Sequence, residues 1–377
     1  MGQSPRIGLA PPGRFRLGLF CYNVEHANAL TRVPERWTAS FPDIVAALRM
    51  AEDAGFDFAL PIARWRGYGE RNLRGKCFET LTLAAALAGS TRRITLFSTV
   101  HVPLVHPLLA AKALATIDHA SGGRAGLNIT AGWNQDEFDM FGHVQEPHDT
   151  RYDQAREWFS LYSRVIAGEG PFDHDGRWYR GKGIVGAPAS LQRPRPPTLS
   201  AGFSPAGRDF AASTCDHLFT FLTTMEQARI DLDDIAARAA RAERRIGVLT
   251  TCYVVCRPTR AEAEDYHRRY AEEMADEELV QGTFDIKQRH AANYGASGRG
   301  DYQRRFDRAR LAGGNGTYPL VGTPADVAEQ LVAIARAGFA GATVSFVNFL
   351  RELPFFAAEV MPILARAGLR EEAMETA

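Results

Sequence analysis

Three polar side chains stand where an apolar strand ends or a helix begins, and their types suit a ligand with a phosphate and a polar edge. Asn128 lies in the apolar run Leu127–Ala131, so its amide must find a hydrogen-bond partner. Arg151 begins a helical pattern, where its charge and the free backbone N–H groups favour a phosphate. Ser204, followed by Pro205, begins another helix and adds a hydroxyl and backbone donors. Parallel α/β folds bind ligands at the carboxyl ends of their strands, so we expect these groups to meet at one site.

Each of these side chains also has a purely structural explanation. Arg151 could form a surface ion pair, and Ser204 could cap its helix without touching a ligand. Asn128 could bond to a backbone group. Glu137, in the acidic run that follows, could contact the ligand, order its loop or be a solvated acid. The sequence leaves these alternatives open.

The stretch Ser121–Gly142 places small residues beside an aromatic and several acidic ones. Gly126, Ala131 and Gly132 have little or no side chain, so a flat ligand could lie close to the backbone there. Trp133 follows directly. The alternative is a buried strand followed by a solvated loop.

The loop at residues 62–76 combines arginines with aromatic residues, among them Arg64, Trp65 and Tyr68. Arginine beside aromatic rings suits a flat anionic ligand. A solvated loop of the same composition is the alternative.

Histidines and cysteines give a weaker signal. His101 and His106 follow a predicted strand and could orient a substrate or move protons, although a lone histidine is more often structural. Cys252 and Cys256 are separated by strand-like residues, and no Cys/His pair follows them. We therefore predict no metal site.

The elements that must position these residues alternate between strand and helix. Strand patterns are mostly continuous apolar runs, which are typical of parallel strands covered on both faces. Four such strand–helix units fit either a doubly wound sheet or a closed barrel. The whole chain supplies eight strands, and this favours a (β/α)8 TIM barrel. The predicted strands are Phe15–Tyr22, Phe56–Pro61, Ile94–Thr99, Leu127–Ala131, Thr198–Ala201, His217–Thr220, Ile246–Cys256 and Ala342–Phe346.

Two segments interrupt this alternation. Residues 168–197 contain a turn signal between aromatic flanks and predict a β-hairpin insertion. Residues 277–318 are polar and glycine-containing, and we interpret them as a second insertion that could act as a lid. The proline- and glycine-rich residues 1–14 predict a flexible arm, and residues 15–377 a single barrel domain.

Composition excludes several classes of protein. Lys+Arg and Asp+Glu balance at 44 each, so no electrostatic footprint indicates nucleic acid or an anionic membrane. No apolar run has the length of a membrane span or a signal peptide. Scattered cysteines favour reduced thiols, and hence a cytoplasmic protein.

Five segments carry motifs of a known family. They are LFSTV at 96–100, ATIDHASGGRAGLNITAGWNQDEFDMFG at 115–142, RYDQAREW at 151–158, LSAGFSPAGRDFAA at 199–212 and LVGTPADVAEQL at 320–331. With these motifs the chain resembles the bacterial luciferase-like flavin-dependent monooxygenases. It looks most like the branch of pyrimidine-ring-opening, dimethyl-sulfone and alkanesulfonate monooxygenases.

The resemblance implies a two-component enzyme. It would use reduced FMN and O2 to oxygenate a small organic substrate through a flavin peroxide, and a separate NAD(P)H-dependent reductase would supply the flavin. It also implies a homodimer or homotetramer. The FMN contacts carried over from the family are the backbone of Ala63 and Arg64, together with Asn128, Glu137, Arg151, Tyr152 and Ser204.

The resemblance also associates Thr99 with oxygen, and we predict Thr99 and His101 as catalytic residues. Phe20, Trp65, Tyr68 and Trp133 are predicted to line the substrate pocket. The branch has a lysine where this chain has Arg64, and hydroxylic and small residues where it has Val100–Val102. Both departures argue against a uracil-like substrate.

Three other functions compete with this interpretation. One is a deazaflavin-dependent hydride-transfer enzyme of the same superfamily, and another is a non-catalytic flavin-binding barrel. A metal-dependent barrel hydrolase ranks last, because the sequence shows neither paired histidines after the first strand nor a convergent set of carboxylates.

Overall fold

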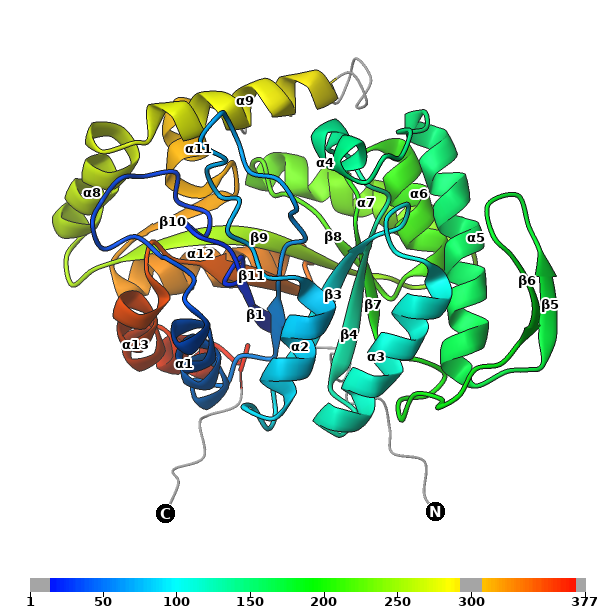
Figure 1. Cartoon of the computed structure of the whole chain (residues 1–377). Helices are drawn as coiled ribbons and strands as arrows, with labels where there is room; N and C mark the ends of the chain where they lie inside the picture. The colour runs from blue at the N-terminus through cyan, green and yellow to red at the C-terminus, as the bar shows by residue number, and fades with distance from the viewer. Residues whose placement is uncertain (1–13, 292–306, 371–377) are drawn as a thin grey trace.

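A closed ring of eight parallel strands forms the centre of the molecule (Figure 1). The structure is a computed structural model that describes residues 14–291 and 307–370. Strand β1 pairs with β11 and β2, and the ring closes where β8 pairs with β9. These pairings confirm the predicted (β/α)8 barrel. The ring strands are β1 Arg16–Phe20, β2 Phe58–Leu60, β3 Thr95–His101, β4 Ala125–Thr130, β7 Thr198–Ala201, β8 His217–Phe219, β9 Gly247–Cys256 and β11 Gly341–Ser345.

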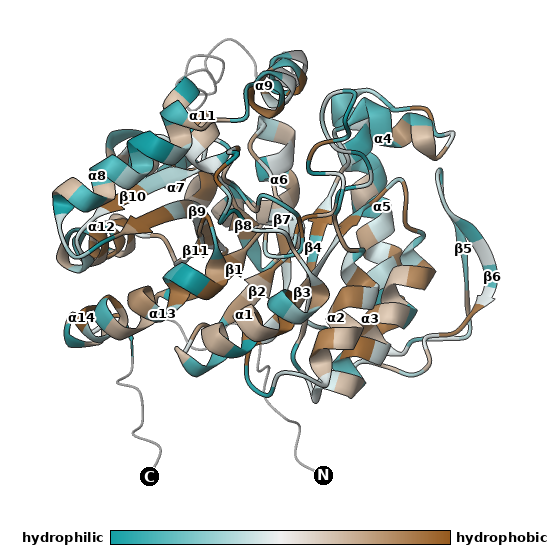
Figure 2. Ribbon diagram, turned by 60° about the vertical axis from the view of Figure 1, so that its left-hand side comes forward, coloured by the Kyte–Doolittle hydropathy of each residue, from teal (hydrophilic) through white to brown (hydrophobic). Residues whose placement is uncertain are grey.

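Helices surround the ring and bury its outer face (Figure 1). All seven residues of β3 are buried, as expected for a strand covered on both faces. In Figure 2 α8 is largely hydrophilic, whereas α2 is largely hydrophobic. The covering helices are α1 Phe41–Asp53, α2 Thr80–Ala88, α3 Pro107–Ser121, α5 His148–Ala167, α6 Pro205–Thr214, α7 Met225–Arg241, α8 Arg260–Arg268, α12 Pro324–Ala337, α13 Phe349–Glu359 and α14 Met361–Arg366.

Aromatic rings fill the inside of the barrel. Phe58 and Phe97 pack edge to face with their centroids 5.8 Å apart, in a cluster drawn from several ring strands. A Cβ added to Gly126 would come within 2.7 Å of the Phe97 ring, and one added to Gly18 within 2.3 Å of Phe58. The expectation that Gly126 makes room for a flat ligand is therefore wrong, because its space belongs to Phe97.

The predicted hairpin in residues 168–197 is confirmed. Strands β5 (Phe172–Asp175) and β6 (Arg180–Ile184) pair antiparallel beside α5 and outside the ring (Figure 1).

The segment 277–318 is more regular than its composition indicated. It contains α9 (Glu277–Ala291) and α11 (Arg308–Gly314), and residues 292–306 lie outside the described part. Strand β10 (Tyr318–Gly322) follows and pairs parallel with the second half of β9. Figure 1 shows α9 across the carboxyl end of the ring. The sequence hid this helix because its buried stripe, Leu279, Val280, Thr283 and Ile286, is short and includes a polar residue.

Two smaller helical features also differ from expectation. The acidic run was expected to be a loop, but α4 spans Gln135–Met140. The pattern of residues 354–367 predicts one last helix that bends at Pro362, whereas α13 ends at Glu359 and Pro362 lies in the first turn of α14. Proline suits that position because a first-turn residue needs no hydrogen bond from its nitrogen.

Within residues 14–291 and 307–370 no helix is long and apolar enough to span a membrane.

Candidate functional site

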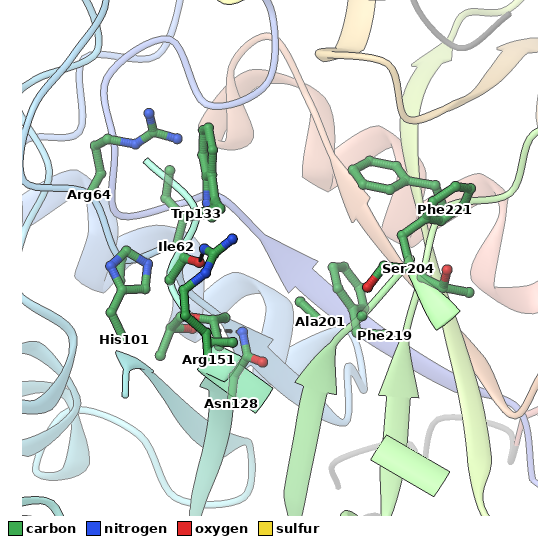
Figure 3. A pocket seen from close by; sticks show the side chains of 18 of the residues that line it. Ile62, Arg64, His101, Asn128, Trp133, Arg151, Ala201, Ser204, Phe219 and Phe221 are labelled. Carbon is green, nitrogen blue, oxygen red and sulfur yellow. Dashed lines mark hydrogen bonds between the residues drawn. The ribbon is translucent and has the colours of Figure 1, made fainter. Parts of the chain in front are cut away.

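A cavity of about 280 Å³ opens at the carboxyl end of the ring and contains most of the predicted site residues (Figure 3). Side chains that follow or end β1, β2, β3, β4, β7 and β8 form its wall. The predicted residues that line it are Phe20, Ala63, Arg64, Tyr68, Thr99, His101, Asn128, Trp133, Arg151, Tyr152 and Ser204. Trp65 and Glu137 are not among the lining residues.

Thr99 and Asn128 form a linked pair on adjacent strands at the base of the cavity. They face each other in the register of β3 and β4. Thr99 Oγ1 donates to the carbonyl of Pro61 at 2.6 Å, and Asn128 Nδ2 donates to Thr99 Oγ1 at 3.1 Å. Because the single hydroxyl proton of Thr99 is already used, Asn128 must present its NH2 group to Thr99. Its Oδ1 is buried and has no hydrogen-bond partner within the described chain.

Glu137 stands behind the wall as the centre of a buried charge cluster. Its side chain is 2% exposed. Its Oε1 accepts from the backbone N–H of Trp65 at 3.0 Å and lies 3.6 Å from Arg64 Nε. Its Oε2 lies 3.3 Å from His101 Nδ1. Glu137 therefore orders the loop after β2, one of the roles left open by the sequence, and does not face the cavity as a predicted cofactor contact should.

His101 is the cavity-facing member of the two histidines. Burial lowers the pKa of His101, with Glu137 acting in the opposite direction. The imidazole is therefore neutral near neutral pH. His106 instead caps α3 by accepting from the N–H of Leu108 at 3.3 Å, and its ring packs against Tyr179. His106 has the structural role, and His101 stays the candidate for substrate or proton contact.

Arg64 and Trp65 differ in direction, since Arg64 lines the cavity and Trp65 does not. The Arg64 guanidinium lies 4.8 Å from the ring centroid of Tyr68 and 5.1 Å from that of Trp133. Trp65 is 39% exposed and packs against Phe141 at 4.9 Å. The expectation that Trp65 lines the pocket therefore does not fit the structure.

Two helices begin at the cavity. Ser204 caps α6 by accepting from the N–H of Gly207 at 3.2 Å, and it is 1% exposed. Helix α5 begins at His148, so Arg151 lies in its first turn and donates to the carbonyl of Gly132. A Cβ on Gly207 would approach the Tyr152 hydroxyl to 2.6 Å, so glycine there lets Tyr152 pack on the start of α6.

A comparison with protein families identifies the family of this chain. Residues 15–341 match the family described as Luciferase-like monooxygenase. The chain belongs to the luciferase-like monooxygenase family. The resemblance inferred from the motifs is confirmed.

Curated relatives match this family member over most of their length. It is 30% identical over 347 residues to the FMNH(2)-dependent dimethylsulfone monooxygenase of Pseudomonas putida, covering 91% of this chain and 93% of that protein. It is 28% identical over 371 residues to the pyrimidine monooxygenase RutA of Methylobacterium radiotolerans, covering 94% and 93%. Both belong to the branch indicated by the motifs.

Solved structures support the fold. The crystal structure of DmoA from Hyphomicrobium sulfonivorans superposes with a TM-score of 0.85 at 22% identity, over 96% of this chain and 90% of that one. At this identity the likeness speaks for the barrel and not for a substrate.

Sequence reasoning missed several lining residues of this luciferase-like monooxygenase. Phe219 and Phe221 form an aromatic side of the cavity at the end of β8 (Figure 3), and Phe203 after β7 also lines the cavity. Lys287 and Asn315 reach it from α9 and the end of α11, and Lys287 Nζ donates to the Asn315 carbonyl at 2.8 Å. Each phenylalanine lies within two residues of the end of a predicted strand, so weighting every strand end equally would have found them. Nothing in the polar segment 277–318 singled out the other two.

Proposed function

We propose that this luciferase-like monooxygenase uses reduced FMN and O2 to oxygenate a small organic substrate. The observation that carries the proposal is the buried, unpartnered Oδ1 of Asn128 at the base of a cavity where a helix also begins. The names of the curated relatives, which are FMNH(2)-dependent or pyrimidine monooxygenases, support the same cofactor and oxidant.

The lining residues fit the chemical needs of FMN. A phosphate needs cations and free N–H groups, which Arg151 and the start of α6 at Ser204 provide. An N–H on the flavin edge needs an acceptor, which Asn128 Oδ1 offers. A flat ring system needs apolar surface, which Phe219 and its aromatic neighbours supply. None of the described lining residues is an aspartate or glutamate, so no carboxylate in the wall repels a phosphate.

When bound, reduced FMN supplies the electrons that reduce O2, so that one oxygen atom enters the substrate and the other leaves as water. The chain contributes position and shielding. Pro61, Thr99 and Asn128 form a fixed hydrogen-bonded series that holds one acceptor at the base of the cavity. Neutral His101 is available to accept or pass a proton at the wall. Phe219 and Phe221 exclude water from one side.

We also propose that the flavin arrives from a separate NAD(P)H-dependent reductase, and that the enzyme is a homodimer or homotetramer. Both proposals follow from the family resemblance. Co-purification with a reductase and sedimentation analysis would examine them.

The main test supplies anaerobically reduced FMN to the purified enzyme, followed by 18O2 and a panel of sulfones, sulfonates and nitrogen heterocycles. We expect one substrate to gain a single labelled oxygen by mass spectrometry. Oxidised FMN and hydrogen peroxide as the only products would favour a non-catalytic flavin-binding barrel. Oxygen-independent reduction of a substrate by a reduced deazaflavin would favour the hydride-transfer alternative.

A further inference from the structure

Arg64 presents a buried hydrogen-bond donor that the protein itself does not satisfy. Its side chain is 7% exposed, and it lines the cavity. Nη1 is fully buried and has no hydrogen-bond partner in the described chain. A buried charged donor without an acceptor is strongly unfavourable, so native proteins rarely keep one without reason.

The surroundings of Arg64 fix its position without using this donor. The rings of Tyr68 and Trp133 flank the guanidinium at 4.8 and 5.1 Å. The nearest Glu137 oxygen lies 3.6 Å from Nε, which balances the charge but is too long for a hydrogen bond. Glu137 is itself held by the backbone of Trp65. The guanidinium is therefore held in place while its Nη1 makes no hydrogen bond within the described chain.

Arg64 also lies away from the start of α6, one of the two groups that we assign to the cofactor phosphate. Figure 3 shows its guanidinium directed towards Trp133, on the opposite side of the cavity from Ser204 and Phe221. The start of α6 at Ser204 supplies the phosphate-type donors. The backbone of Ala63 and Arg64 keeps its predicted contact with FMN, and the Arg64 side chain remains for another ligand.

We propose that Arg64 Nη1 binds a hydrogen-bond-accepting oxygen of the substrate, and so acts as a specificity-determining residue. The group is a polarised oxo group, such as S=O or C=O, or an oxyanion, and the part of the molecule next to it contacts Tyr68 and Trp133. A planar guanidinium recognises either form of oxygen. This inference depends on the proposed function in one respect, namely that the ligand bound by Arg64 is the substrate of the oxygenation.

The test compares Arg64→Met with Arg64→Lys and a matched control. Methionine keeps the length and removes every donor, whereas lysine keeps the charge and loses the fork. Arg66→Met is the control, because Arg66 lies on the same loop, is exposed and does not line the cavity. Circular dichroism and thermal unfolding establish that each variant is folded.

Two affinities are measured for each protein. One is for oxidised FMN, by quenching of flavin fluorescence. The other is for dimethyl sulfone, methanesulfonate and dimethyl sulfide in the presence of FMN, by calorimetry. We expect at least one oxygen-bearing probe to bind the wild type and Arg66→Met more tightly than dimethyl sulfide. Arg64→Met should lose roughly ten- to hundredfold for that probe, the range for a hydrogen bond to a charged group, with unchanged FMN affinity. The affinity of Arg64→Lys for the probe should lie between those of Arg64→Met and the wild type.

Each outcome decides the proposal. A preference of the wild type for methanesulfonate identifies an oxyanion, and a preference for dimethyl sulfone identifies a neutral oxo group. Arg64→Met binding the probe like the wild type would overturn the proposal. So would a parallel loss of FMN affinity, which would assign the side chain to the cofactor, or a wild type that binds no oxygen-bearing probe. If oxygenation fails in the 18O2 experiment while probe binding still needs Arg64, the proposed function is wrong and the Arg64 site stands.

Discussion

Replacing Asn128 by alanine should weaken FMN binding while leaving the fold almost as stable as before. Asn128 is 5% exposed, and its Nδ2 bond to Thr99 Oγ1 contributes about 1 kcal/mol to stability. The substitution also removes the unpartnered Oδ1, whose burial costs about 1–3 kcal/mol. Thr99 keeps its bond to the Pro61 carbonyl. The two changes oppose each other, so the unfolding free energy should differ from that of the wild type by no more than about 2 kcal/mol.

FMN affinity should respond differently, because the variant removes the acceptor that we assign to the flavin edge. A lost hydrogen bond of about 1–2 kcal/mol corresponds to a roughly 5- to 30-fold higher Kd. Fluorescence titration measures the Kd, and urea unfolding without FMN measures stability.

Ser98→Ala is the matched control for Asn128→Ala. Ser98 is buried on β3, donates to the Thr80 carbonyl at 3.2 Å and does not line the cavity. It should lose about 1 kcal/mol of stability with unchanged FMN affinity. If Asn128→Ala lost more than about 2 kcal/mol of stability and kept its FMN affinity, the amide would be structural and the assignment refuted.

Three further predictions concern other parts of the chain. Ser204→Ala should lose about 1 kcal/mol of helix-capping stability and should also bind FMN more weakly. Ser40→Ala removes the comparable cap of α1 and should lose stability alone. Urea unfolding and FMN titration of both variants test this prediction. Burial and neighbouring arginines lower the pKa of His26 to about 4, from 6.5. The unfolded chain therefore binds more protons between these values, so stability should fall as pH drops from 6.5 to 4, and His26→Asn should show a shallower fall in urea unfolding across that range. FMN should slow limited proteolysis within residues 277–318 if this segment closes over the cofactor, and equal cleavage rates with and without FMN would count against a lid.

The ring strands were predictable because their sequence signal is strong. Most are runs of residues buried on both faces, such as Phe58–Leu60, and a strand of this kind has few polar positions to confuse the pattern. The turn and helix signals between the strands are equally direct. Gly55 follows α1, and Pro205 opens α6.

The segment over the cavity was harder to predict because its stabilising contacts are few and long-range. In α9 the buried stripe is narrow, and the polar residues around it dominate the composition. Strand β10 contains Pro319 and Gly322, both unfavourable within a strand, and only its pairing with β9 reveals it.

The site was predictable in its members and less so in their directions. Motifs indicated Asn128 and Ser204 correctly as cavity residues, but no local pattern shows that Arg64 turns inward while Trp65 turns out. The space beside Gly126 was assigned to a ligand because a sequence does not reveal which distant ring occupies it. Phe97 lies on the neighbouring strand, and its packing depends on the strand register.

Strand β9 belongs to the barrel in its first half and supports the neighbouring strand β10 in its second half. Its first residues, Gly247–Leu249, complete the ring with β8, while Cys252–Cys256 support β10. Residues 257–317 therefore leave from the end of one strand and return to the strand beside it. Residues 257–317 can change in length or sequence without shifting the register of the ring strands. The part of the cavity wall that this segment supplies can therefore vary between relatives, while the part that the ring strands supply is preserved.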